Sequence, residues 1–329
     1  MSRFLIVTLV PTLLVGCSRP EKAAEGDATA AKPTVVQAKG SDTMVNLVQR
    51  LSEEYTKVNS KVMVAVTGGG SGTGIKALTD KTTDIADASR AMKDDEIALA
   101  KTNGVDPVQT IVAYDGLSIY VNKDNPIEHI DFDALKCIYS AEGTCAHWKD
   151  VGITLDCDGK GDDTIVKVGR QNNSGTYDYF KEHVIGKEGK FTNTMDQSGT
   201  QQVVDVVSTT KCAIGYGGMG YSSDTSRHVC LSKTKDDACV EPSEANVLNG
   251  SYPFSRPLYM YTNGAPTGAA KDFIDWAKSP AAKTFVVESG FVPTPEANGG
   301  AAPAVDAPTG ATAAPAEAAP AAPAPAPAG

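Results

Sequence analysis

Residues 169–176 read GRQNNSGT and stand between two patterns that together decide the fold class. The preceding run at 164–168, TIVKV, is apolar and β-branched, as expected of a buried strand. The segment at 177–185, YDYFKEHVI, follows without a break. This order predicts a strand, a polar turn and the start of a helix.

Three residue types in this stretch bear on function. Asn173 or Ser174 is placed to cap the helix, and the free N–H groups at such an end favour an anion. Arg170 adds a planar guanidinium that matches the geometry of tetrahedral oxyanions. An ordinary capped helix with a surface arginine is the alternative interpretation of this stretch alone.

The same order of elements occurs twice nearer the N-terminus. The strand predicted at 35–38 leads through the turn 40–43 into a helix at 44–58. The strand predicted at 61–66 enters the glycine-rich turn 67–74, after which a further helix opens at Ile75. Strands that alternate with helices indicate a parallel α/β sheet, which binds ligands at the carboxyl ends of its strands.

The remaining elements follow from periodicity and capping signals. We expect two irregular regions, a loop-rich one at 141–160 and a disulfide-tied excursion at 227–241. The strands at 108–114 and 117–121 are expected to be separate, interrupted at 115–116. Further strands are predicted at 83–89, 213–216 and 258–262, and helices at 94–101, 131–139, 201–208, 269–278 and 281–288.

The composition excludes two classes of partner. The chain has 329 residues and a formal net charge of -10, which argues against nucleic acid and against anionic membranes bound through a basic face. A small anion is not excluded, because local donors decide its binding.

The N-terminus predicts export. A basic start is followed by an apolar core, residues 4–15, that is too short to span a bilayer, and LVGC at 14–17 resembles a bacterial lipobox. We expect a signal peptide at 1–17 with lipidation at Cys17, and a flexible tether at 18–34. Residues 294–329 are almost all Ala, Pro and Gly and predict a disordered tail.

The cysteines favour disulfide bonds. Without Cys17, the seven cysteines leave an even number, which in an exported chain indicates disulfides, although six cysteines allow 15 pairings. Cys230–Cys239 is the pair favoured by proximity. A zinc site is the competing interpretation, but no CxxC or HxxxH spacing is present.

Nucleotide binding and catalysis find little support. Gly72-Thr73-Gly74-Ile75-Lys76-Ala77 fits a loose GxGxxA pattern, but an exported lipoprotein rarely meets a dinucleotide, and no P-loop Gly-Lys-Ser/Thr follows. Ser71 lacks the second glycine of a GxSxG elbow. The four histidines stand in no triad or metal spacing, so we expect a non-enzymatic protein without a cofactor or metal.

What remains are three helix-starting turns rich in glycine and hydroxyl groups, plus one arginine. Glycine lets the backbone approach a ligand closely, and Ser and Thr hydroxyls donate to oxyanions without adding charge. Such a set describes a dehydrated tetrahedral anion.

Five motifs carry a family resemblance: GSDTM at 40–44, GGGSGTGIK at 68–76, DIADASR at 84–90, RQNNSGT at 170–176 and AIGY at 213–216. With the C-terminal pattern at 273–293, they resemble the PstS family, the phosphate-binding proteins of bacterial ABC transporters. The resemblance spans about residues 35–293, and RxxxSGT is its most specific part.

The resemblance implies an α/β, two-lobed periplasmic-binding-protein fold of type II, with two crossovers and the ligand in the interlobe cleft. One lobe would comprise 35–114 and 252–293, and the other, with all six remaining cysteines, 115–251. Any disulfides would then brace the second lobe without locking the hinge near Tyr114 and Ser251. We expect a monomer that binds phosphate and an ABC transporter permease.

The family's ligands carry over residue by residue as a resemblance. Those that match its phosphate-binding motifs are Thr43, Met44, Ser71, Arg170, Ser174, Gly175 and Thr176. Possible additions are Ser41, Asp42, Gly72, Thr73, Asp87 and Arg90.

One position departs from the family. Well-known members carry an Asp after Ala-Ser, where this chain has Arg90. That carboxylate would accept the proton of hydrogen phosphate and exclude sulfate, so Asp42 or Asp87 is needed as a substitute. Arg90 is either a second cationic ligand or, as we favour, the partner of Asp84 or Asp87 in a structural ion pair.

Three alternatives to phosphate transport stay open. A binding site without the family's Asp would suit another oxyanion such as sulfate or molybdate. The long tail would suit a surface lipoprotein with a role in adhesion or signalling. An enzyme acting on phosphate esters is the most distant alternative.

Overall fold

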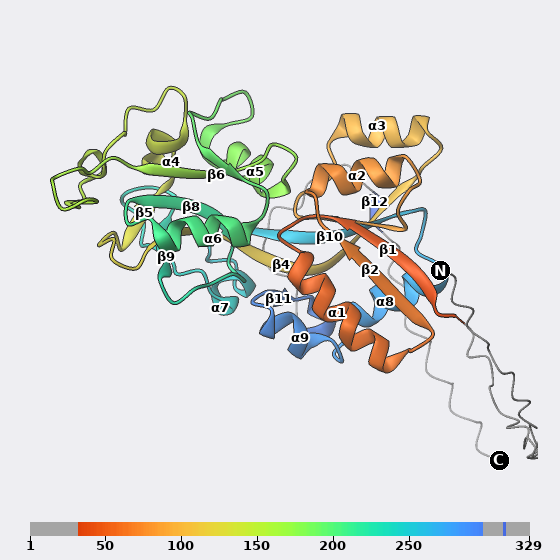
Figure 1. Cartoon of the computed structure of the whole chain (residues 1–329). Helices are drawn as coiled ribbons and strands as arrows, with labels where there is room; N and C mark the ends of the chain where they lie inside the picture. Colours follow the sequence, from red (N-terminus) through yellow and green to blue (C-terminus); the bar gives the residue numbers. More distant parts are fainter. Residues whose placement is uncertain (1–31, 299–311, 314–329) are drawn as a thin grey trace, which may run out of the picture. The chain divides into compact units, whose positions relative to one another are not determined.

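A computed structural model describes residues 32–298 and 312–313 (Figure 1). The predicted signal peptide with Cys17, the tether up to residue 31, and most of the tail lie outside these residues. The chain divides into two compact units, 1–32 and 33–329, and the description below concerns the second.

The strands form one curled sheet with two parts, which we call half-sheet 1 and half-sheet 2. Half-sheet 1 has the order β2-β1-β3-β10-β4. Its strands are β1 (Thr34–Gly40), β2 (Val62–Thr67), β3 (Ile85–Ala88), β10 (Ser255–Asn263), β11 (Val292–Pro293) and the first part of β4 (Pro107–Asn122). β1 is parallel to β2 and β3, but β10 is antiparallel to both β3 and β4. The prediction of a parallel sheet therefore holds for β1, β2 and β3 but not for β10, which comes from a distant part of the sequence.

Helices cover both faces of half-sheet 1 (Figure 1). One face packs on α1 (Val45–Val58), α8 (Gly268–Ala277) and α9 (Lys283–Glu288), and the other on α2 (Ser71–Thr79) and α3 (Asp94–Thr102). Side chains along β10 point alternately to the two faces. Leu258 and Met260 pack in the core beside α1, whereas Tyr259 and Tyr261 pack in the core beside α2.

Half-sheet 2 continues the order from β4 through β8 and β6 to β7. Its elements surround an aromatic core in which the rings of Phe180 and Tyr216 stack 3.9 Å apart. The strands are β5 (His129–Asp131), β6 (Val166–Arg170), β7 (Met195–Gln197), β8 (Ala213–Gly218) and β9 (Ser226–Ser232). The helices are α4 (Phe132–Tyr139), a 3-10 turn (Trp148–Val151), α5 (Gly175–Phe180) with a π-helical continuation (Lys181–Ile185), α6 (Thr200–Thr209) and α7 (Glu244–Leu248).

β4 joins the two half-sheets as one unbroken strand. It pairs with β10 up to Gly116 and with β8 from Leu117 onward. The expected interruption at 115–116 is therefore wrong, because Asp115 is buried and ion-paired inside the sheet and does not end the strand. The change of partner lies next to the boundary that we predicted between residues 114 and 115.

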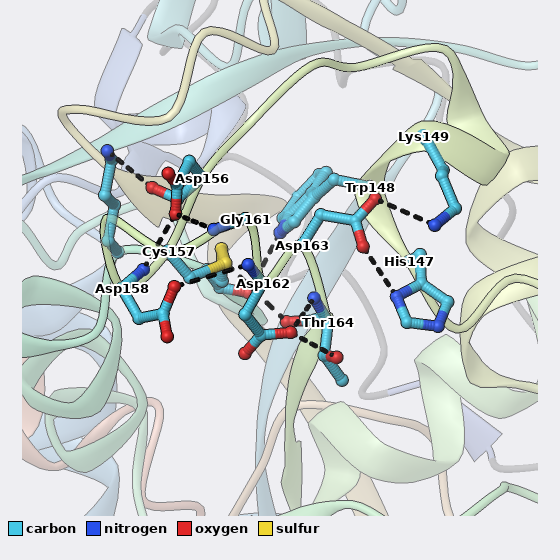
Figure 2. The surroundings of a disulfide bond; sticks show 12 residues. His147, Trp148, Lys149, Asp156, Cys157, Asp158, Gly161, Asp162, Asp163 and Thr164 are labelled. Atoms are coloured by element: carbon cyan, nitrogen blue, oxygen red, sulfur yellow. Dashed lines mark hydrogen bonds and ion pairs between the residues drawn. A yellow bond between two sulfur atoms is a disulfide. The ribbon is translucent and has the colours of Figure 1, made fainter.

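Three disulfides tie the loops of half-sheet 2: Cys137–Cys145, Cys157–Cys212 and the predicted Cys230–Cys239. Near Cys157, backbone N–H groups of the loop donate to the Asp156 carboxylate, among them that of Gly161 (Figure 2). Trp148 donates to the carbonyl of Cys212 at 3.1 Å. The region 227–241, expected to be irregular, begins within β9, because residues 226–232 pair with β4 and β5.

The predicted tail is not without structure where it is described. Residues Pro295–Asn298 form the short helix α10, and Thr312–Ala313 pairs with β4 as β12. The Glu296 side chain forms an ion pair with Lys278 at 3.5 Å, so the start of the tail is joined to the body of the protein.

Candidate functional site

Arg170 is the last residue of β6 and is completely buried, at 0% exposure. Its Nη1 donates to Thr200 Oγ1 at 3.1 Å and its Nη2 to the carbonyl of Ser198 at 2.9 Å. The nearest carboxylate is that of Asp42, 3.9 Å from Nη2. Burial lowers the pKa of the Arg170 guanidinium to about 10, and Asp42 only partly opposes this. Arg170 therefore holds a positive charge that neutral groups surround and one distant carboxylate compensates.

The turn after Arg170 is shaped by its serine and glycine. Ser174 caps α5 as predicted, because its Oγ accepts from the N–H groups of Thr176 and Tyr177. That leaves the Ser174 hydroxyl proton available as a donor. A Cβ atom at Gly175 would lie 2.5 Å from Ser71 Oγ, so only glycine lets the two half-sheets approach this closely.

Four hydroxyl groups of half-sheet 1 meet this turn, and all belong to residues no more than 2% exposed. Ser41 Oγ donates to Ser89 Oγ at 2.9 Å, and Ser71 Oγ lies 3.3 Å from the same atom. Thr43 Oγ1 forms a hydrogen bond of 2.8 Å with Thr176 Oγ1, across 133 positions in the sequence. The structure therefore brings Ser41, Thr43 and Ser71 together with the 174–176 turn.

Asp42 and Asp87 occupy different surroundings. Asp42 Oδ1 accepts from the N–H of Gly69 at 2.8 Å, which places this carboxylate between the first two turns and near Arg170. Asp87 meets the site loops only through its backbone, where its carbonyl accepts from the N–H of Ser41. Its buried Oδ1 has no partner among the described residues, and burial raises the pKa of this carboxyl to about 7.

Three other candidates, Met44, Gly72 and Thr73, have contacts that hold the surrounding structure together. Met44 is buried in the core beside α1, and its N–H donates to the carbonyl of Ser41. The N–H of Gly72 donates to the carbonyl of Asn173, and Thr73 Oγ1 accepts from the Asn173 amide at 3.5 Å. Gly72 and Thr73 therefore form a backbone-rich contact between the half-sheets.

Arg90 forms a structural ion pair, but not with Asp84 or Asp87 as we expected. Its two terminal nitrogens each lie 2.7 Å from a Glu96 oxygen, and its Nε lies 2.8 Å from Asp178 Oδ2. Burial alone would lower the pKa of the Arg90 guanidinium, but Glu96 and Asp178 together raise it. Asp178 belongs to α5, so this pair bridges the half-sheets.

Sequence reasoning missed three residues of the site. Ser89 lies between Ser41 and Ser71: its Oγ accepts from Ser41 Oγ, and its N–H donates to Ser71 Oγ at 3.1 Å. Its place directly after the strand β3 is a signal that could have identified it. Asp115 and Arg256, on neighbouring strands β4 and β10, form a buried ion pair of 2.7 Å. No local pattern indicates that pair.

A groove of about 760 Å³ is lined in part by Arg90, Lys93, Asp178 and Arg256, and none of the residues of the hydroxyl cluster lines it. Among the described residues, no group of histidines, cysteines and acids has the arrangement of a metal site. In that same part of the chain, no helix is both long and apolar enough to cross a bilayer.

The chain resembles known proteins along most of its length. Residues 27–281 match the family model of the PBP superfamily domain. The chain is 37% identical over 267 residues to the phosphate-binding protein PstS of Pseudomonas aeruginosa strain PAO1, covering 78% of this chain and 82% of that protein. It is 31% identical over 277 residues to protein SphX of Synechococcus elongatus, covering 80% and 79%.

Solved structures agree with this relationship. A phosphate ABC transporter substrate-binding protein from Clostridium perfringens, with bound phosphate, superposes with a TM-score of 0.69 at 28% identity, over 79% of this chain and 100% of that one. An ABC-type phosphate transport receptor from Vibrio cholerae gives a TM-score of 0.61 at 25% identity, over 78% and 99%. With its two-part α/β fold, the chain belongs to the PBP superfamily and, within it, to the PstS family of phosphate-binding proteins.

Proposed function

We propose that this protein captures inorganic phosphate outside the cytoplasm and delivers it to the permease of an ABC transporter. The observation that carries the proposal is Arg170, a fully buried cation whose nearest carboxylate is 3.9 Å away. A buried charge is costly unless an opposite charge compensates it. A dianionic ligand would provide that compensation.

The proposed ligands lie on both half-sheets. Thr43 and Ser71 would donate from half-sheet 1, and Ser174, Gly175, Thr176 and Arg170 from half-sheet 2. Bound phosphate would replace the Thr43–Thr176 hydrogen bond with bonds from each hydroxyl to a phosphate oxygen. Ligand binding would therefore stabilise the approach of the half-sheets about the β4 and β10 connections.

Asp42 is the carboxylate that we assign to the proton of hydrogen phosphate. It is the acid nearest Arg170, whereas the buried Oδ1 of Asp87 has no hydrogen-bond partner among the described residues. A carboxylate that faces the unprotonated oxygens of sulfate would be left without a hydrogen-bond donor, which disfavours sulfate. Arg90 is excluded from direct binding in this proposal, since two carboxylates already occupy its nitrogens.

The proposal also covers the cellular location and the oligomeric state of the protein. The sequence of residues 1–17 supports export and attachment to the membrane through a lipid on Cys17. We propose a monomer without enzymatic activity. The names of its relatives, a phosphate-binding protein and a transporter substrate-binding protein, support a binding role.

Calorimetric titration of the purified protein with phosphate, arsenate, sulfate and molybdate tests the proposal. We expect tight binding of phosphate and its structural analogue arsenate, and binding of sulfate at least 100-fold weaker, as for a site with an unpaired buried carboxylate (about 3 kcal/mol). Equal affinity for sulfate or molybdate would favour the second candidate, a binding protein for another oxyanion. The absence of an acid at position 90 is the observation behind that candidate.

A further inference from the structure

A buried ion pair lies where β4 passes from one half-sheet to the other. Asp115 and Arg256 are direct neighbours in the β4–β10 register, and each is at most 1% exposed. Asp115 Oδ2 accepts from Arg256 Nε at 3.0 Å and from Nη2 at 2.7 Å. Desolvation raises the pKa of the Asp115 carboxyl, and the Arg256 guanidinium partly opposes that rise.

The same guanidinium reaches the proposed phosphate site. Arg256 Nη2 also donates to Thr176 Oγ1 at 3.0 Å. A guanidinium has donors and no acceptor, so Thr176 must accept this hydrogen bond. The hydroxyl proton of Thr176 is therefore left for another acceptor, and Thr43 Oγ1 lies 2.8 Å away.

We propose that Arg256 is a positioning residue, which makes the Thr176 hydroxyl a permanent donor toward the ligand. Without Arg256, the Thr43–Thr176 pair could share its protons in either direction, and binding would have to reorient them. A donor that is already oriented spends no free energy on reorientation when the oxyanion arrives. This inference rests on the proposed phosphate site and adds to it the residue that sets the direction of one hydrogen bond.

Two further features of Arg256 fit this role. Its Nη1 is buried and has no acceptor among the described residues, as expected of a group held close to an anion site. Asp115 neutralises most of the Arg256 charge, so this arginine contributes direction more than attraction, unlike Arg170.

A double-mutant cycle on the intact protein, with phosphate as the probe, tests the inference. Arg256→Lys keeps the charge but loses the planar fork that bonds Asp115 and Thr176 together. Phosphate affinity should fall roughly tenfold when Thr176 is present, the usual effect of one oriented hydrogen bond. In the Thr176→Val background, the same change should alter affinity by less than about twofold. Arg227→Lys is the matched control. Arg227 lies on β9, is partly buried and donates to the backbone carbonyl of Asn125.

Each outcome decides the inference. Equal losses in both backgrounds would overturn it, because they would show that Arg256 acts on the fold or the field and not through Thr176. If Arg256→Lys does not fold, Asp115→Asn takes its place in the cycle, because it removes the carboxylate that holds the Arg256 guanidinium. It should weaken phosphate binding when Thr176 is present and change it by less than about twofold in the Thr176→Val background, and equal losses in both would overturn the inference. Wild-type protein that bound no phosphate would remove the proposed function itself, and this inference with it.

Discussion

Two arginines near the hydroxyl cluster are both almost fully buried, yet their surroundings differ in one respect. Arg170 bonds a hydroxyl and a carbonyl and has a single carboxylate at 3.9 Å. Arg90 contacts two carboxylates, Glu96 and Asp178, at 2.7 and 2.8 Å. The pKa of the guanidinium is lowered at Arg170 and raised at Arg90.

This difference separates a binding residue from a structural one. An arginine whose charge is already paired with carboxylates gains little from a bound anion. A buried arginine whose charge is only weakly compensated is stabilised by an anion that binds to it. Arg170 is therefore the residue expected to attract phosphate, and Arg90 the residue expected to hold the half-sheets together. The predictions below test that distinction, from the largest expected effect to the smallest.

Arg170→Gln should have the largest effect. The loss of a charged donor pair should weaken phosphate binding by roughly 10² to 10⁴-fold, since hydrogen bonds to charged groups contribute about 1.5–3 kcal/mol each. Calorimetric titration measures the loss, and Arg90→Gln is the matched control, expected to lose no more than about tenfold, because it weakens only the ion pair between the half-sheets. Similar losses in the two variants would erase the distinction between the arginines.

Asp87→Asn tests how the stability of the protein depends on a buried carboxyl group that has no partner among the described residues when it ionises. The pKa of the Asp87 carboxyl is raised from 3.8 to about 7 by burial, so between these pH values the folded protein holds a proton that the unfolded chain has released. Wild-type stability should therefore fall as pH rises through this interval, by up to about 1.4 kcal/mol per pH unit, and level off above pH 7.

The Asn variant should lack this slope and should exceed wild type in stability most clearly above about pH 7. Urea unfolding midpoints between about pH 4 and 8 measure the difference between the two proteins. Curves that stayed parallel across this range would show that the Asp87 carboxyl titrates normally.

Asp178→Asn should weaken the contact that Arg90 and Lys93 make across the half-sheets. We expect phosphate to dissociate about three- to tenfold faster, because a partly exposed ion pair contributes about 1 kcal/mol and acts only when the half-sheets are together. Stopped-flow release measures this rate. Glu182→Gln is the control, since its ion pair with Lys187 stays within one segment. An unchanged release rate in Asp178→Asn would contradict the bridging role.

Replacing Cys230 and Cys239 by alanine should affect binding least. This disulfide closes a loop of half-sheet 2, and neither of its cysteines is a hydrogen-bond partner of Arg90 or Arg170. Thermal unfolding should occur at a lower temperature, because the cross-link constrains the unfolded chain. Phosphate affinity should stay within about twofold, and a larger loss in calorimetry would show that the loop is coupled to the site.

Local signals were sufficient for much of the fold. Ser174 as the cap of α5, the helix α1 after the turn at 40–43, and the disulfide Cys230–Cys239 all depend on residues close in sequence. The antiparallel entry of β10 and the unbroken course of β4 were not predictable, because each depends on a partner strand more than a hundred positions away.

The candidate site divides in the same way. Turn chemistry and the family resemblance identify Thr43, Ser71 and Arg170, because glycine, hydroxyl groups and a guanidinium at helix starts have a recognisable chemistry of their own. The partners of Arg90 and the pairing of Arg256 with Asp115 and Thr176 exist only after folding. The physical reason is that residue type sets which hydrogen bonds a side chain is able to form. Burial and neighbouring charges then decide which of them it forms, and whether any remain for a ligand.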